Sequence, residues 1–183
     1  MKNFGESRSL PKGLTSEEFF KLIRVIPPKD RTAKIAFLLA FASGLRISEI
    51  AGGIKPDGTV VPPLRKEDIL INQHQINIWN GKGGVDRVVP LPKGWKQWMY
   101  DYLPIKKSVR TLERKFKKYI KLAGLPSHYV FHSLRHSFGL RAIEKGIPAN
   151  QVQLLMGHSS LSVTNVYTKA RPQDALDKYE ELF

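Results

Sequence analysis

The segment AKIAFLLAFASG, residues 33–44, constrains the fold more than any other part of the chain. Wound as a helix it is apolar all round, and Gly44 supplies the left-handed residue at which many helices end. A helix of this kind must be buried on every side, so other elements have to pack around it. The segment therefore predicts a central core helix in a compact domain.

Other segments carry a single apolar stripe at helical spacing. The first begins at Thr15, which forms a capping box with Glu18 and precedes a stripe that stops at Pro27. The same spacing predicts further helices at about 95–102, 109–120, 132–145, 149–156 and 162–167, and from Pro172 to the end of the chain.

Two segments alternate instead, as strands do. INIW (76–79) and VDRVVPL (85–91) flank NGKGG, which indicates a β-hairpin with Lys82 at or beside its turn. Residues 51–63 hold several glycines and prolines and predict an exposed loop with one short strand. The expected fold class is α+β: a mainly helical domain with a small antiparallel sheet of about three strands.

The charge of the chain indicates a polyanionic partner. Its 30 Lys and Arg against 16 Asp and Glu leave a net charge of +14. No apolar signal core and no run of about 18 apolar residues is present, so we expect double-stranded DNA rather than a membrane as the partner. The absence of cysteine excludes disulfides and thiolate metal sites and fits an intracellular protein, expected in the cytoplasm with the nucleoid.

One predicted helix combines an apolar stripe with a basic face. A solvated face is the simpler reading, but five cations at helical spacing with only Glu113 nearby favour contact with phosphates. The candidate DNA contacts are Arg110, Arg114, Lys117, Lys118 and Lys121, together with Arg87 from the predicted hairpin.

The segment FHSLRHSF places His132, Arg135 and His136 within about one helical turn. A zinc-protease helix would need a glutamate at position 133, where this chain has serine, so no metal site is predicted. Arginine beside histidine suits an anionic group such as a phosphate. A further arginine, Arg46 in SGLRISEI, either joins this site or forms an ion pair with Glu49.

Four segments occur in an order and at separations that a chance match to a single motif does not explain: SGLRISEI, GKGGVDRVVP, HSLRH and LLMGHSSLSVTNVYT. From about Leu10 to the end, the chain resembles the catalytic domain of the tyrosine recombinase (phage integrase) family, of the Xer-like or mobile-element type. The resemblance implies a division into an arm or linker (1–13), a catalytic domain (14–171) and a C-terminal amphipathic helix (172–183).

The resemblance also implies roles for single residues. Arg46 and Arg135 would hold the scissile phosphate, and Tyr167 would attack it. Glu49 and His136 would support the active site without reacting. The remaining implied active-site residues are Lys82, a candidate general acid, and the histidines His132 and His158. Neither metal, ATP nor another cofactor is expected, because a 3′-phosphotyrosyl link conserves the energy of the broken phosphodiester.

The implied activity is site-specific DNA recombination, as integration, excision or dimer resolution. Two alternatives stay open: relaxation of DNA in the manner of a type IB topoisomerase, and a basic DNA-binding module in which Tyr167 is structural. Family members usually carry a core-binding domain before the catalytic one, whereas only about ten residues precede the match here, and the 51–63 loop is longer than expected.

The last segment, PQDALDKYEELF, is acidic and amphipathic in a basic chain. Packing on its own domain is one prediction for it. The other, implied by the resemblance, is docking onto a neighbouring copy, so that dimers or tetramers assemble on DNA.

Overall fold

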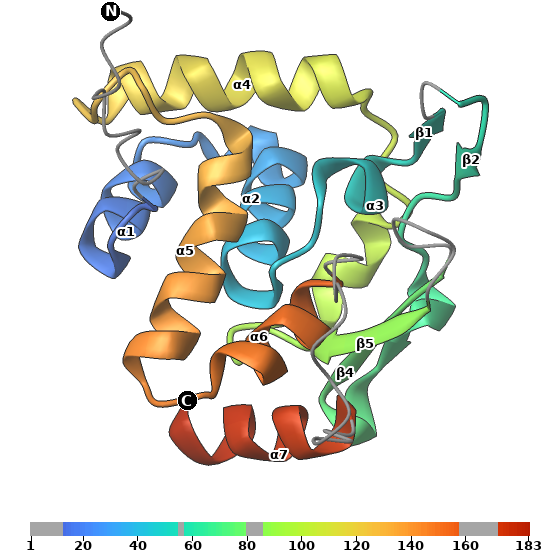
Figure 1. Cartoon of the computed structure of the whole chain (residues 1–183). Helices are drawn as coiled ribbons and strands as arrows, with labels where there is room; N and C mark the ends of the chain where they lie inside the picture. The colour runs from blue at the N-terminus through green and yellow to red at the C-terminus, as the bar shows by residue number, and fades with distance from the viewer. Residues whose placement is uncertain (1–12, 55–56, 80–85, 158–171) are drawn as a thin grey trace, which may run out of the picture.

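The computed structural model describes residues 13–54, 57–79, 86–157 and 172–183, and Figure 1 shows their arrangement. The helices are α1 (Ser16–Arg24), α2 (Arg31–Ser43), α3 (Ile47–Ala51), α4 (Val109–Leu122), α5 (Phe131–Glu144), α6 (Ala149–Met156) and α7 (Pro172–Leu182). The strands are β1 (Gly53–Ile54), β2 (Val60–Val61), β3 (Ile69–Leu70), β4 (Gln75–Ile78) and β5 (Arg87–Pro90). Of the predicted arm 1–13, only Gly13 is described, and the predicted helix at 162–167 lies outside the described residues.

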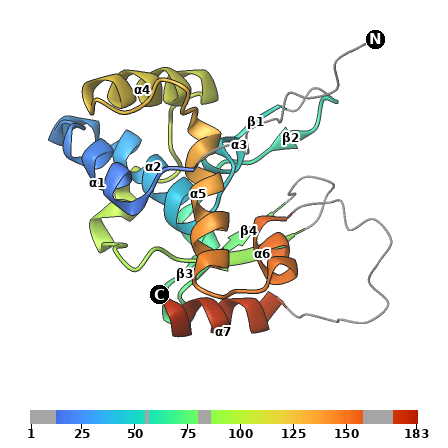
Figure 2. The same cartoon turned by 60° about the vertical axis from the view of Figure 1, so that its left-hand side comes forward.

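Helix α2 is the core helix that the sequence predicts. Most of its side chains are fully buried, and α5 lies against it (Figures 1 and 2). Gly44 ends it with φ 68°, where a Cβ would stand 2.6 Å from the Phe138 ring of α5. Glycine is therefore required twice at this point, for the left-handed backbone and for the close approach of α5.

Aromatic rings join the helices around α2. The Phe37 ring of α2 meets Phe116 of α4 at 5.4 Å and Phe131 of α5 at 5.6 Å, both edge to face. On another side, Phe41 stacks on Phe19 of α1 at 3.8 Å. These contacts fix α1, α4 and α5 on one common core.

The predicted hairpin is confirmed, and β3 extends it into a three-stranded antiparallel sheet of order β3-β4-β5. Ile76 of β4 pairs with Val89 of β5, and both are fully buried. Lys82, between these strands in the sequence, lies outside the described residues.

The 51–63 segment contains two short strands rather than the one expected. Strands β1 and β2 pair antiparallel, with Gly53 opposite Val61 and Ile54 opposite Val60. Gly52 and Gly58 have φ of 72° and 83°, so glycines permit the reversals that the segment needs. The second strand was missed because its two residues are too few to show alternation.

Two further details differ from the prediction. The helix expected at 95–102 is a 3-10 helix over Gln97–Tyr102, with hydrogen bonds at the tighter i→i+3 spacing, such as Leu103 N–H to the Tyr100 carbonyl. The short helix α3 was not anticipated at all.

Helix α7 packs on its own domain, the first of the two roles considered for it. Leu176 and Tyr179 are buried in a second apolar cluster with Phe138 of α5 and Val152 of α6. The Tyr179 hydroxyl donates to the Ala42 carbonyl at 3.1 Å, which ties α7 to the end of α2. Within the described ranges, no helix is long and apolar enough to cross a bilayer.

Candidate active site

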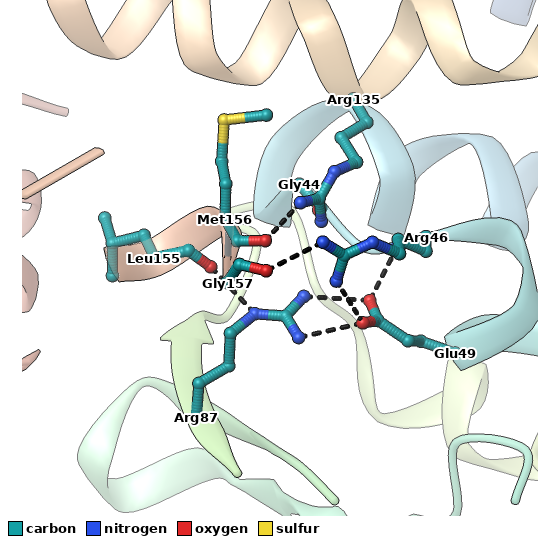
Figure 3. A network of polar contacts seen from close by, with 8 residues as sticks. All are labelled: Gly44, Arg46, Glu49, Arg87, Arg135, Leu155, Met156 and Gly157. Carbon is teal, nitrogen blue, oxygen red and sulfur yellow. Dashed lines mark hydrogen bonds and ion pairs between the residues drawn. The ribbon is translucent and has the colours of Figure 1, made fainter. Parts of the chain in front are cut away.

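Three arginines from distant parts of the chain converge beside the C-terminal end of α6 (Figure 3). Arg46 stands at the start of α3, Arg87 begins β5, and Arg135 lies in the middle of α5. Each guanidinium donates to a different backbone carbonyl of Leu155, Met156 or Gly157. The end of α6 suits this contact, because the last carbonyls of a helix lack partners within the helix and carry partial negative charge.

Arg135 is the most deeply buried of the three, with 1% of its surface exposed. One of its Nη atoms donates to the Gly44 carbonyl at the end of α2, and the other donates to the Met156 carbonyl. Its Nε has no hydrogen-bond partner among the described residues. Burial and the neighbouring charge of Arg46 lower the pKa of Arg135 to about 9, so it is still charged at neutral pH.

Arg46 connects the end of α6 to α3. It donates to the Gly157 carbonyl at 2.8 Å and to Glu49 Oε1 at 2.9 Å. The Glu49 carboxylate also accepts the Arg46 backbone N–H at 2.7 Å, which caps the first turn of α3. The predicted ion pair is therefore present, and it is part of the arginine cluster rather than an alternative to it.

Arg87 is the main partner of Glu49. Its two Nη atoms each donate to one Glu49 oxygen at 2.8 Å, and its Nε donates to the Leu155 carbonyl at 2.9 Å. Burial on its own would raise the pKa of Glu49, but the hydrogen bonds and charge of Arg87, followed by Arg46, lower it to about 2. Glu49 is thus ionised throughout the neutral range.

The placement of Arg87 differs from that of the other candidate DNA contacts, and its role as one stays a prediction. The residue is 8% exposed, and its side chain donates to Glu49 and to the Leu155 carbonyl. The sequence contains a pattern that predicts the burial of Arg87. Residues two apart on a strand share a face, and Val89, two residues after Arg87, belongs to the core. An inward arginine needs a buried acid, and Glu49 is that acid.

The described cluster carries an excess of positive charge. Three guanidiniums face a single carboxylate, which leaves two positive charges in a largely desolvated place. Together with the unpaired Nε of Arg135, this excess favours the binding of an anion.

Two histidines continue the site along α5. His132 is exposed in the first turn of the helix, three residues before Arg135, and its ring stands perpendicular to that of His136 at 4.6 Å between centroids. Burial, and then the charge of Arg135, lower the pKa of His136. A neutral His136 at neutral pH suits a residue that positions its neighbour without adding charge.

The basic face of α4 is fully exposed. All five predicted cations, Arg110, Arg114, Lys117, Lys118 and Lys121, point away from the core. A groove of about 580 Å³ lies between this face and the start of α5, and Arg110, Arg114, Lys117 and Phe131 are among its lining residues. Val130, two residues before His132, also lines the groove.

A buried acid holds α4 from its inner side. Asp30 accepts hydrogen bonds from Lys115 and from the Tyr119 hydroxyl, the latter at 2.6 Å. Burial and the adjacent Asp30 carboxylate raise the pKa of Tyr119 to about 12. No sequence pattern pointed to Asp30, because its partners are 85 and 89 residues away.

The profile of the phage integrase family matches residues 12–174. The chain belongs to this family. It is 36% identical to tyrosine recombinase XerA of Thermococcus onnurineus over 180 residues, and 32% identical to tyrosine recombinase XerC of Chlamydia trachomatis over 185 residues. These alignments cover 88% of the chain but only 59% and 55% of the two relatives, so the chain spans less than two thirds of their length.

Solved structures of integrases share the fold. The integrase from mycobacterium phage Brujita superposes with a TM-score of 0.68, covering 98% of this chain and 60% of that one at 23% identity. A XerA recombinase superposes at 0.63, with 94% and 66% covered and 20% identity. The lambda integrase catalytic core superposes at 0.58, with 80% and 91% covered and 20% identity. The predicted family and fold class are thereby confirmed.

For this member of the phage integrase family, the structure brings together Arg46, Arg135 and Glu49 of the expected site. His132 and His136 lie on the same helix as Arg135, one before it and one after it. Lys82, His158 and Tyr167 lie outside the described residues, and their roles stay predictions. So does the expectation that no metal takes part, although no group of three or more His, Cys, Asp or Glu in the described ranges could hold an ion.

Gly157 connects the described cluster to the next residue, His158. Its φ of 59° is left-handed, and a Cβ at this position would stand 2.8 Å from Arg87 Cδ. Only glycine can therefore offer its carbonyl to Arg46 while Arg87 passes so close. The sequence showed Gly157 as a helix end, but not this second requirement.

Proposed function

We propose that this chain catalyses site-specific DNA recombination, with Tyr167 as the nucleophile and a 3′-phosphotyrosyl intermediate. The observation that carries the proposal is the buried cluster of Arg46 and Arg135, whose positive charge exceeds that of its one acid, Glu49. Membership of the phage integrase family supports the same reading.

The arginine cluster suits a phosphodiester in chemical terms. Negative charge grows on the non-bridging oxygens as a nucleophile attacks, and fixed guanidiniums neutralise it without reorganising. A donor of this kind is typically worth ~3 kcal/mol, or about a hundredfold in rate. Arg135 is held on two sides by carbonyls of the fold, so its orientation is set before DNA arrives.

The proposed reaction balances without an external energy source. The Tyr167 oxygen forms a bond to the scissile phosphorus while the bond from phosphorus to the 5′ oxygen breaks. The tyrosine proton passes to a neighbour such as His132, and Lys82 protonates the departing 5′ oxygen. A 5′ hydroxyl of another strand then reverses these steps and joins the new partner.

Duplex DNA is the proposed partner, with the exposed cations of α4 as contacts for its phosphates. Lambda integrase has been solved as a dimer bound to a core site and as a tetramer bound to a Holliday junction. We infer that this chain also acts as an assembly on DNA. A role of α7 in that assembly falls either to its exposed residues, among them Glu180 and Glu181, or to its release from its own domain.

A nicked suicide substrate tests the proposal, because the fragment after the cleaved bond diffuses away and the covalent adduct accumulates. We expect an adduct with the wild-type chain that Tyr167→Phe abolishes while DNA binding persists. Tyr102→Phe is the matched control and should form the adduct normally. An adduct in the Tyr167→Phe variant would rule out this nucleophile, and EDTA should leave wild-type adduct formation unchanged.

The two alternatives predict other outcomes. A type IB topoisomerase relaxes supercoiled plasmid but does not exchange strands between two linear duplexes that carry paired sites. A non-catalytic binding module gives no adduct with any substrate, and its DNA-dependent activities are unaffected by Tyr167→Phe.

A further inference from the structure

The β1–β2 hairpin exposes two apolar side chains next to each other. Ile54 is 76% exposed and Val60 is 66% exposed, and the two residues are directly paired across the strands, so they share one face. Val61, on the other face, is buried and anchors the hairpin. Figure 2 shows β1 and β2 extending away from the helices on the same side of the view as α6. The pair forms a small apolar surface on the hairpin, and its significance depends on the groove and the charges beside it.

A groove of about 590 Å³ lies at the base of this hairpin. Its lining includes Ala51, Ile54 and Val61, together with Val109 and Arg110 at the start of α4. Arg110 is the only charged residue among the described residues that line it. The groove therefore combines apolar walls with one cation.

The same groove continues onto the basic face of α4. Ser108 and Arg110 line both this groove and the one that runs along α4 past Arg114 and Lys117. Ser108 caps α4, and the first turn of that helix holds no acidic residue, so its positive end is not neutralised there. Along this path three cations, Arg110, Arg114 and Lys117, outnumber one acid, Glu113. This excess of positive charge suits a polyanion rather than the face of another basic chain.

We propose that the β1–β2 hairpin and the first turn of α4 form a second contact with duplex DNA, beside the arginine cluster. Ile54 and Val60 pack against the apolar edges of deoxyribose in a groove of the duplex, while Arg110 and the start of α4 hold the adjoining phosphate. This inference rests on the proposed function for the identity of its ligand.

The connection through α3 sets how far this contact lies from the cleaved bond. Arg46 precedes α3 and the hairpin follows it, and the five residues of α3 span about 7.5 Å. Following the chain on to Ile54 sets an upper limit of roughly 20 Å on its distance from the cluster, which corresponds to about six base pairs of duplex. The hairpin contact thus falls within about six base pairs of the cleaved bond.

The absence of cysteine from the 183-residue chain allows a direct test. Ile54→Cys, labelled with a thiol-specific photocrosslinker, is irradiated on a duplex that carries the cleavage site. We expect crosslinks to DNA about six base pairs or fewer from that site. Ile143→Cys, on the 50% exposed Ile143 of α5, is the matched control and should give few. Crosslinks mainly to a second protein copy, or a DNA yield no higher than that of the control, would overturn the proposal.

A pair of substitutions provides an independent measurement. Ile54→Ser with Val60→Ser should weaken binding to a duplex with a long flank by about tenfold, the effect of losing roughly one buried aliphatic side chain. Shortening the flank should weaken wild-type binding to the same level and leave the double variant almost unaffected. Equal sensitivity of both proteins to flank length would contradict the proposed contact. Because both positions are exposed, thermal unfolding should be unchanged.

These outcomes separate the inference from the proposed function. If wild type forms no adduct on the suicide substrate, the recombinase assignment fails, yet Ile54→Cys can still crosslink to DNA. If the adduct forms and the hairpin gives no DNA crosslink, only the second contact is wrong.

Discussion

Arg87 and Glu49 face each other through two parallel hydrogen bonds of 2.8 Å, and both side chains are almost fully buried. The pair joins β5 to α3 across the base of the arginine cluster. Glu49 also pairs with Arg46, so its single negative charge is shared and the three guanidiniums keep an excess of two positive charges. Within the described residues, Arg87 therefore belongs to the framework of the site.

Arg87→Lys should destabilise the fold. A lysine ammonium cannot form the planar fork, so one oxygen of the buried Glu49 carboxylate loses its partner. We expect the free energy of unfolding to fall by about 2 kcal/mol in denaturant titrations. Arg65→Lys, at an exposed arginine that contacts Asp68, is the control and should change little. If Arg87 bound DNA phosphates instead, an uncharged replacement such as Arg87→Gln would reduce the salt dependence of DNA binding by folded protein, which we expect to stay the same.

Glu49→Gln should remove a pH-dependent part of the stability. The pKa of Glu49 falls from 4.5 to about 2 in the folded chain, so its stabilising effect is complete above pH 4.5 and lost as the pH falls toward 2. The shift corresponds to about 3 kcal/mol at neutral pH. The gap in unfolding free energy between wild type and Glu49→Gln should thus narrow as the pH is lowered from 5 to about 2. Glu17→Gln, at an exposed position, should show no such narrowing.

Loss of single cations from α4 should change the salt dependence of DNA binding. Each lysine or arginine that contacts a phosphate releases counterions, so Arg114→Ala or Lys118→Ala should reduce the slope of log affinity against log salt by about 1. Lys21→Ala removes an exposed cation from a different helix, α1, and should leave the slope unchanged. An identical reduction in all three variants would mean that net charge, rather than the α4 face, determines binding.

Asp30→Ala should loosen α4. Lys115 and Tyr119 would lose their shared acceptor, and we expect a loss of about 2 kcal/mol in the free energy of unfolding. Tyr119→Phe removes one donor and should cost about 1 kcal/mol. A double-mutant cycle measures the coupling, and simple additivity of the two changes would contradict a direct interaction. In the Asp30→Ala variant, the pKa of Tyr119 should also fall from about 12 toward its ordinary value.

Local patterns predicted the elements whose signals repeat along the chain. The apolar run of α2, the stripe of α4 and the alternation of β4 and β5 each recur often enough to show a period. Strands β1 and β2 have two residues each and helix α3 has five, so the period of a strand or helix does not repeat within them. The helix was missed, and only one of the two strands was anticipated.

Sequence alone determined the family, the core helix and the residue types of the site, because these depend on order and spacing along the chain. Tertiary structure decided how the site is paired. Glu49 binds Arg87 from 38 residues away, and Arg135 is held by carbonyls 91 and 21 residues distant. A buried charge takes its partner from whichever element packs against it, and only the packed fold determines which element that is.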